Sequence, residues 1–224
     1  MKVYKFIGMP QIKPVMAILK KEVRKFREPI LTKISKKRDP FKVLISCILS
    51  LRTKDNVTGL ASKRLFSKAD IPKKILKLKT REIEKLIYPV GFYKTKAKNL
   101  KILCRQLLDN HKGKVPHSEE DLLKLKNVGR KTMNIVRTYG FDDPEGLAID
   151  IHCFRIPNRL GWVKTKTPEE TEFVLRKTLP KKYWRDFNDI FVIFGQNICV
   201  PVSPFCSKCP ISKYCPKIGV KRSR

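Results

Sequence analysis

Four cysteines near residue 200 have the spacing of a metal-binding motif, Cys199-x6-Cys206-x2-Cys209-x5-Cys215. Four thiolates on such short arms can converge on one tetrahedral centre, because the chain between them wraps around it. Disulfides are not expected in a chain without an export signal. The spacing alone suits a zinc ion as well as an iron–sulfur cluster. The other three of the seven cysteines are expected to be small core residues: Cys47, Cys104 and Cys153.

A lysine follows a segment with the composition of a tight turn. The stretch Leu125-Lys126-Asn127-Val128-Gly129-Arg130-Lys131-Thr132 lies between a short capped segment and an apolar-periodic one. It therefore predicts two short helices joined by a hairpin whose backbone N–H groups form a phosphate seat. An ordinary helix–turn–helix corner is the alternative. An amine that is surrounded by positive charge loses its proton more readily, so Lys131 is a candidate nucleophile.

An acidic residue stands in an apolar frame nineteen positions after Lys131, in Ala148-Ile149-Asp150-Ile151-His152. A buried carboxylate is costly unless it is paired or functional, so Asp150 is a candidate catalytic residue. The plainer interpretation is that Asp150 is the N-cap of a helix that begins at Ile151. His152 by itself is more often structural than catalytic.

The charge of the chain limits the class of its partner. Among 224 residues, 51 Lys+Arg stand against 20 Asp+Glu, which gives a formal net charge of +31. The hydrophobic content of 42% is enough for a packed core, so the charge does not indicate disorder. A nucleic-acid-binding protein fits this charge best, with a ribosomal or a membrane-surface protein as alternatives. The most apolar run, Val43 to Leu51, is too short to span a bilayer, and we expect a reduced, cytoplasmic protein.

Helical patterns position these motifs. Asp39-Pro40 supplies an N-cap and a first-turn proline for a buried helix over 41–51. Apolar residues from Ala97 to Leu108 recur at the spacing of an amphipathic helix that ends near Asn110 and Gly113. The stretch Ile190 to Phe194 has strand propensity but continues an apolar helical pattern, and no second strand is available to pair with it.

Two further helix starts have capping signals. Ser118 with Asp121 resembles a capping box, and Thr167 with Glu170 forms a full one, opening a helix to about Leu179. The sequence therefore predicts an all-α protein of about ten short helices in two lobes.

Together, the three motifs resemble the endonuclease III family of DNA repair enzymes. Three more segments stand in family order: 49–55, 91–97 and Asn158-Arg159. The resemblance implies a two-lobed helix-hairpin-helix DNA glycosylase architecture. A six-helix barrel would span 33–143, with the hairpin motif at about 121–139. Residues 1–32 and 144–224 would form an iron–sulfur domain with its cluster loop at 199–215. The resemblance favours a 4Fe-4S cluster over zinc and places DNA in the cleft between the lobes.

The resemblance also implies roles for the candidate residues. Lys131 would attack C1′ of the sugar under a damaged, flipped-out base, and Asp150 would support the developing charge and assist proton transfers. The expected activity is that of a bifunctional DNA glycosylase and AP lyase of base excision repair, which removes damaged pyrimidines and nicks the strand by β-elimination. The expected partner of this monomer is double-stranded DNA with damaged bases or abasic sites, in the nucleoid or, in a eukaryote, the nucleus.

Several positions depart from the family pattern. Arg52 stands where many members have the glutamine that fills the gap left by the flipped base, and Phe92 occupies the second wedge position. Asn127 replaces the usual glycine of the hairpin and can adopt the same left-handed turn. The loop between Cys199 and Cys206 lacks the basic residues of bacterial relatives. We expect DNA contacts from Arg52, Phe92, Asn127, Val128, Gly129, Arg130 and His152.

Two other functions fit part of the pattern. A mismatch glycosylase of the same superfamily is monofunctional. The adenine-specific type normally lacks the lysine and has a further C-terminal domain, and the thymine-specific type typically has tyrosine at the position of Lys131. A non-catalytic DNA-binding factor would use the hairpin and a zinc site. Lys131 favours the bifunctional enzyme.

Overall fold

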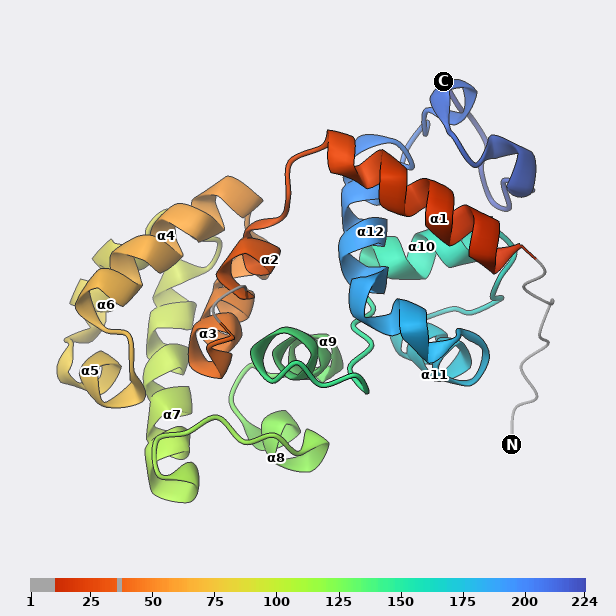
Figure 1. The fold of residues 1–224 in the computed structure, drawn as a ribbon. Coiled ribbons are helices and arrows are strands. Elements are labelled where there is room, and N and C mark those ends of the chain that lie inside the picture. Colours follow the sequence, from red (N-terminus) through yellow and green to blue (C-terminus); the bar gives the residue numbers. More distant parts are fainter. Residues whose placement is uncertain (1–10, 36–37) are drawn as a thin grey trace. The chain divides into compact units, whose positions relative to one another are not determined.

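The computed structural model describes residues 11–35 and 38–224, and Figure 1 shows that these are helices joined by short connections. The described residues contain twelve α-helices and no strand, which confirms the all-α prediction and exceeds the expected number of about ten. Within this part of the chain, no helix is both long and apolar enough to cross a membrane.

The described residues fall into two compact units, and each is described by itself. One unit is Pro29–Asp143, and the other combines the residues up to Glu28 with Pro144–Arg224. The helices of the first unit are α2 (Ile30–Ser35), α3 (Pro40–Ser50), α4 (Asp55–Lys68), α5 (Pro72–Lys77), α6 (Thr80–Ile87), α7 (Tyr93–His111), α8 (Glu119–Lys124), α9 (Arg130–Ile135) and the π-helical turn η2 (Val136–Gly140). Those of the second unit are α1 (Ile12–Glu22), α10 (Ile151–Arg159), α11 (Pro168–Thr178) and α12 (Trp184–Asn197).

Helix α3 is the centre of the first unit. It begins as the sequence predicts, because the Asp39 side chain accepts a hydrogen bond from the backbone N–H of Lys42 at 3.0 Å and Pro40 occupies the first turn. Helices α2, α4, α7 and α9 and the turn η2 all contact α3. Every residue from Val43 to Leu49 is buried, so this part of α3 has no solvent-facing side.

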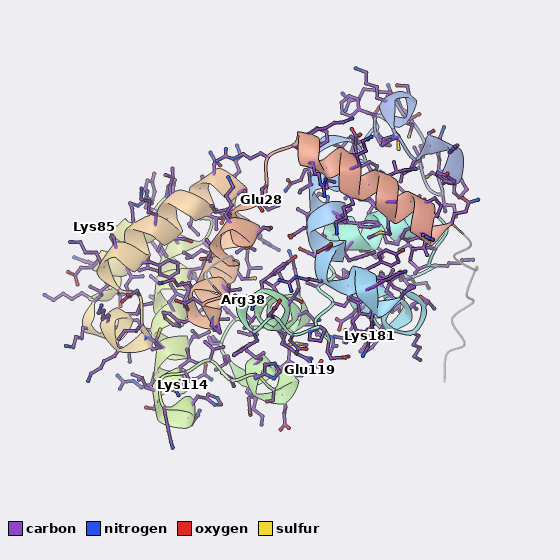
Figure 2. The ribbon with its side chains drawn as sticks, in the orientation of Figure 1. Glu28, Arg38, Lys85, Lys114, Glu119 and Lys181 are labelled. Carbon is purple, nitrogen blue, oxygen red and sulfur yellow. The ribbon has the colours of Figure 1, made fainter. Side chains whose placement is uncertain are left out.

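Helix α7 is the longest helix of the first unit and packs against α5 and α6. It follows Phe92, whose φ is +58°, and it ends where Lys112 and Gly113 adopt left-handed φ angles of +53° and +77°. The predicted end near Gly113 is therefore confirmed. Basic side chains such as Lys85 and Lys114 project from this unit (Figure 2).

Helix α12 provides the core of the second unit. Phe187, Phe191 and Phe194 are almost fully buried, and the rings of Phe187 and Phe191 stack with centroids 4.2 Å apart. Helices α1 and α10 both pack on α12. The prediction that residues 190–194 are helical is confirmed, because they lie within α12 and the described residues contain no strand.

The two predicted capping motifs differ in detail. Ser118 Oγ accepts a hydrogen bond from the Asp121 backbone N–H at 3.1 Å, as predicted, and the Ser118 hydroxyl donates to the Asp121 carboxylate at 2.8 Å, a contact other than the backbone return bond of a capping box. Thr167 Oγ1 likewise accepts from the Glu170 N–H, but the Glu170 carboxylate bonds the N–H of Lys166 instead of that of Thr167. The prediction of a full capping box was therefore wrong by one residue for the return bond.

Candidate active site and cysteine pocket

The segment between α8 and α9 is the predicted tight turn between two short helices. Asn127 adopts a left-handed conformation with φ at +64°, as expected for a residue that replaces glycine in this turn. The Val128 N–H donates to the carbonyl of Leu125 at 3.1 Å and closes the turn. Gly129 then acts as the N-cap of α9, which begins at Arg130. The structure thus brings the predicted residues from Asn127 to Lys131 together in one short hairpin.

Two side chains of α7 hold this hairpin, and neither was predicted. The Gln106 amide donates to the carbonyl of Lys124 at 3.2 Å and accepts from the N–H of Lys126 at 2.8 Å. The Asn99 side chain donates to that of Asn127 at 3.2 Å. These contacts bracket the turn on both sides and fix it against the longest helix of its unit. Amide side chains on the polar side of a helix give no periodic signal, so no sequence pattern identified them.

Gly129 leaves open space at the start of α9. Its φ of −103° is accessible to any residue, and a Cβ placed on it would meet no described atom within 4 Å. Neither the backbone conformation nor packing within the chain therefore requires glycine here. The missing side chain is consistent with close approach of a ligand backbone to the hairpin.

Lys131 is the second residue of α9 and is partly buried. Its neighbour Thr132 is buried and accepts a hydrogen bond from the Cys47 thiol of α3, with 3.6 Å between Sγ and Oγ1. Burial raises the pKa of the Cys47 thiol, and the positive charge of Lys131 opposes that shift. The candidate nucleophile therefore lies close to the central helix of its unit.

Arg52 and Phe92 lie together in the same unit. Both adopt left-handed conformations, with φ of +52° and +58°. The Arg52 guanidinium carbon is 5.6 Å from the centroid of the Phe92 ring, and that ring is 63% exposed. An exposed aromatic ring next to a guanidinium has the chemistry to stack on nucleobases. The two predicted wedge positions are thus adjacent.

Asp150 caps α10 and is buried. One carboxylate oxygen accepts hydrogen bonds from the N–H groups of His152 at 2.8 Å and Cys153 at 2.9 Å, which confirms the N-cap interpretation. The side chain of Asn188 on α12 donates to the Ala148 carbonyl at 3.1 Å and anchors the preceding segment. A fixed carboxylate that is 8% exposed can serve both as a cap and as a catalytic group.

His152 lies one turn from Arg155 on α10. Its Nδ1 is 3.1 Å from the guanidinium of Arg155, which also donates to the carbonyls of Gly195 and Cys199. The predicted residue His152 is therefore placed in a network that joins α10 to α12 and to the cysteine loop. Lys131 belongs to the first unit and Asp150 to the second.

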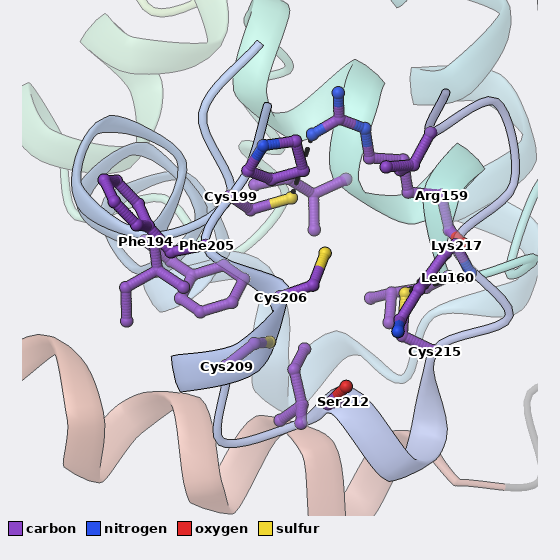
Figure 3. Close-up of a pocket in the computed structure, with 15 residues that line it drawn as sticks. Arg159, Leu160, Phe194, Cys199, Phe205, Cys206, Cys209, Ser212, Cys215 and Lys217 are labelled. Atoms are coloured by element: carbon purple, nitrogen blue, oxygen red, sulfur yellow. Dashed lines mark hydrogen bonds between the residues drawn. The ribbon is translucent and has the colours of Figure 1, made fainter. Parts of the chain in front are cut away.

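The four predicted cysteine ligands line a single pocket, shown in Figure 3. Much of the remaining wall is apolar and comes from Ile156, Leu160, Phe194, Ile198, Phe205 and Ile211. Burial raises the pKa of Cys209 to about 11 and also raises that of Cys215. Because the thiolate is the metal-binding form of cysteine, binding of a metal group in this pocket would release protons from these thiols.

Arg159 and Lys217 donate to the cysteine sulfurs. The Arg159 guanidinium is 3.3 Å from Cys199 Sγ, as the dashed line in Figure 3 marks, and the Lys217 N–H is 3.4 Å from Cys215 Sγ. Such N–H donors stabilise thiolate charge and are typical of metal-bound cysteine. Sequence analysis placed Arg159 in a family-like segment but did not assign it this contact.

The four thiols line one pocket, although no three His, Cys, Asp or Glu side chains of the described residues lie close enough together to count as a metal-holding group. Zinc and an iron–sulfur cluster both use four thiolates, so the residues of this pocket fit either group.

Comparison with known proteins agrees with these features. Residues 45–181 match the profile of the HhH-GPD superfamily base excision DNA repair proteins. Endonuclease III of Thermotoga maritima is 48% identical over 180 residues, which cover 80% of this chain and 84% of the relative.

Two solved structures have a similar fold. A non-covalent endonuclease III–DNA complex has a TM-score of 0.79 at 32% identity, and a trapped endonuclease III–DNA covalent intermediate in an estranged-adenine complex has a TM-score of 0.77 at 30% identity. Each alignment covers 92% of this chain and 95% of the other. The chain belongs to the endonuclease III family of the HhH-GPD superfamily of base excision DNA repair proteins.

Proposed function

We propose that this protein is a bifunctional DNA glycosylase and AP lyase that removes oxidised or otherwise damaged pyrimidines from duplex DNA, with Lys131 as nucleophile. Membership of the endonuclease III family supports the activity class. The observation that carries the assignment to Lys131 is its place at the start of α9, directly after the open hairpin at Gly129. A relative of similar fold was trapped as a covalent DNA intermediate, which is the species this chemistry forms.

The reaction proceeds in two stages. The Lys131 amine attacks C1′ of the sugar, the bond from C1′ to the damaged base breaks, and the base leaves with the bonding electrons and a proton. Opening of the sugar ring then gives an imine between Lys131 and C1′. The imine acidifies the C2′ proton, and its removal expels the 3′ phosphate by β-elimination. Asp150 supports positive charge on the sugar in the first stage and assists proton transfer.

The hairpin and the wedge bind DNA in this proposal. Backbone groups around Val128 and Gly129 face a phosphate, with Arg130 adding positive charge, and Asn127 maintains the turn. Arg52 and Phe92 fill the space that the flipped nucleotide leaves. Unpairing a damaged base costs less than unpairing a sound one, which contributes to selectivity.

We further propose that Cys199, Cys206, Cys209 and Cys215 hold a 4Fe-4S cluster. Four protein thiolates leave no open coordination position, so the cluster supplies structure and positioning instead of Lewis-acid chemistry. The unit with Pro144–Arg224 would then be the cluster domain and Pro29–Asp143 the barrel domain. Iron and acid-labile sulfide at about four atoms each per chain support this assignment. Stoichiometric zinc without sulfide contradicts it.

Borohydride trapping tests the lyase directly. The protein is incubated with duplex DNA that carries one oxidised pyrimidine, reduced, and resolved by denaturing electrophoresis. The wild-type chain is expected to form a covalent adduct, and Lys131→Gln to form none. Lys114→Gln, which changes an exposed lysine outside the hairpin, is the matched control and is expected to trap like the wild type.

Three outcomes contradict the proposal. If no damaged or abasic duplex yields an adduct while base release is observed, the protein is a monofunctional glycosylase. If neither base release nor an adduct is observed, it is a DNA-binding factor without glycosylase activity. An adduct that persists in Lys131→Gln assigns the nucleophile to another amine.

A further inference from the structure

Lys96 is a buried lysine that the proposed chemistry does not use. It lies in the first turn of α7 and is 5% exposed. Its ammonium nitrogen donates to the carbonyls of Leu49 at 2.9 Å and Leu51 at 2.6 Å, and it lies 3.4 Å from Thr53 Oγ1. The three N–H donors of the ammonium group therefore meet three oxygen acceptors. All three acceptors lie between Leu49 and Thr53, where α3 ends and the chain leads to α4.

Thr53 extends this network to a second segment. Its hydroxyl bonds the carbonyl of Leu51 at 3.2 Å and accepts from the N–H of Gly91 at 3.1 Å. A Cβ on Gly91 would lie only 2.4 Å from the carbonyl oxygen of Arg52, so the two segments touch through their backbones. Lys96 and Thr53 thus join the segment before α4 to the segment before α7.

Arg52 and Phe92 lie on the two backbone segments that this network holds together. Each lies within one residue of a network member and has a left-handed backbone, an unfavourable conformation for a residue with a side chain unless its surroundings hold it. The Arg52 guanidinium lies 5.6 Å from the Phe92 ring. No ion pair with Lys96 is recorded among the described residues, so the ammonium acts through carbonyl and hydroxyl oxygens.

We infer that Lys96 is a positioning residue that holds Arg52 and Phe92 in place as a paired wedge for the gap left by a flipped nucleotide. This inference rests on the proposed function of the protein. In this role Lys96 touches neither the DNA nor the reacting atoms. It acts by holding the backbone segment before α4 and, through Thr53, the segment before α7. Its ammonium also faces the carbonyl end of α3, where a positive charge is favourable.

The charge on Lys96 is retained at a cost. Burial lowers the pKa of Lys96 to about 8, and the Cys47 thiol is its titratable neighbour on α3. A structural role alone would be met by an apolar side chain, which avoids this desolvation. A role that needs three simultaneous donors is met by an ammonium group.

Lys96→Met tests the inference, because methionine has a similar length and no donor. Lys101→Met is the matched control, since Lys101 lies on the same helix and its ammonium donates to the Leu78 carbonyl at the end of α5, away from the wedge. Trapping rates are measured on one abasic strand, first single-stranded and then in a duplex. A single strand needs no wedge, and a duplex does.

Lys96→Met is expected to slow trapping on the duplex about tenfold and to leave the single-strand rate within about twofold of the wild type. Lys101→Met should leave both rates unchanged. A duplex probe with a stable abasic analogue opposite 2-aminopurine reports wedge insertion independently, through the fluorescence of the orphaned base. Lys96→Met should reduce the fluorescence change that the wild type causes.

The outcomes separate the inference from the proposed function. The positioning role is wrong if the wild type traps and Lys96→Met slows trapping equally on the single strand and on the duplex. It is also wrong if Lys96→Met slows trapping on neither substrate. If the wild type does not trap at all, the lyase proposal fails, while the 2-aminopurine signal still tests the wedge. Thr53→Val, which removes the shared hydroxyl and keeps Lys96, should give the same selective loss at smaller size if Lys96→Met folds poorly.

Discussion

The guanidinium of Arg159 donates a hydrogen bond to the sulfur of Cys199 at 3.3 Å. The same group donates to the carbonyls of Val200 at 2.8 Å and Pro201 at 2.7 Å, so one buried side chain closes the first arm of the cysteine motif. Arg159 is the last residue of α10, and Asp150 caps the first turn of that helix. One helix therefore holds both the cysteine pocket and the candidate catalytic carboxylate.

Arg159→Met is expected to weaken retention of the metal group. The change removes the donor to Cys199 and leaves two carbonyls unpaired, so the proposed iron–sulfur cluster should be lost from the pocket faster. Loss of visible absorbance in the presence of a chelator measures this rate, which should rise about tenfold or more. Arg224→Met is the control, because Arg224 packs on Phe205 of the same loop and has no recorded cysteine contact among the described residues. Equal rates in both variants would contradict the prediction.

Replacement of Asp150 separates capping from catalysis. Asparagine caps helices about as well as aspartate, so the free energy of unfolding of Asp150→Asn should lie within about 0.5 kcal/mol of the wild-type value. That of Asp150→Ala should be lower by about 1 kcal/mol. Base release should fall at least a hundredfold in both variants, because neither carries the negative charge. Chemical denaturation and single-turnover base release are the two measurements. An active Asp150→Asn would reduce Asp150 to a cap.

Local signals predicted local structure well in this chain. Asp39-Pro40 starts α3, Ser118 starts α8, and Asn127 adopts the left-handed turn, since each depends on contacts within a few residues. The cysteine spacing likewise located a pocket that its own short arms define.

The unpredicted residues act over long distances in sequence. Gln106 holds a hairpin about twenty positions away, Lys96 bonds the end of α3, and Arg159 bonds the loop near Cys199. Long polar side chains are normally solvated, and nothing in their own neighbourhood marks the few that tertiary packing buries. The Glu170 carboxylate bonds the N–H of Lys166 instead of that of Thr167 for a similar reason. The path of the chain before the helix decides which of these two neighbouring N–H groups lies within reach of the carboxylate.

Gly129→Ala is expected to affect DNA binding without affecting the fold. The φ of −103° is allowed for alanine, and an added methyl group meets no described atom, so the free energy of unfolding should change by less than about 1 kcal/mol. The methyl group would stand in the space where the proposal puts a DNA phosphate, so affinity for an abasic-analogue duplex should fall about tenfold. Fluorescence anisotropy measures this affinity. Unchanged affinity would show that DNA does not approach the hairpin at Gly129.

The stability contribution of Lys96 should depend on pH with a defined sign. Burial lowers its pKa from 10.5 to about 8, so below pH 8 both the folded and unfolded chains hold the proton and the folded protein bears the full cost of the buried charge. Between pH 8 and 10.5 the unfolded chain holds a proton that the folded chain has released, so the free energy of unfolding rises with pH. Burial also raises the pKa of Cys47, so at pH 8 this neighbour is a neutral thiol.

Urea denaturation of the wild type and Lys96→Met at a series of pH values isolates the effect, since other groups cancel in the difference. The wild type should gain on the order of 1 to 2 kcal/mol over the variant between pH 7 and 10. A difference that stays constant, or that falls as the pH rises, would mean that Lys96 is not a desolvated ammonium in the folded protein.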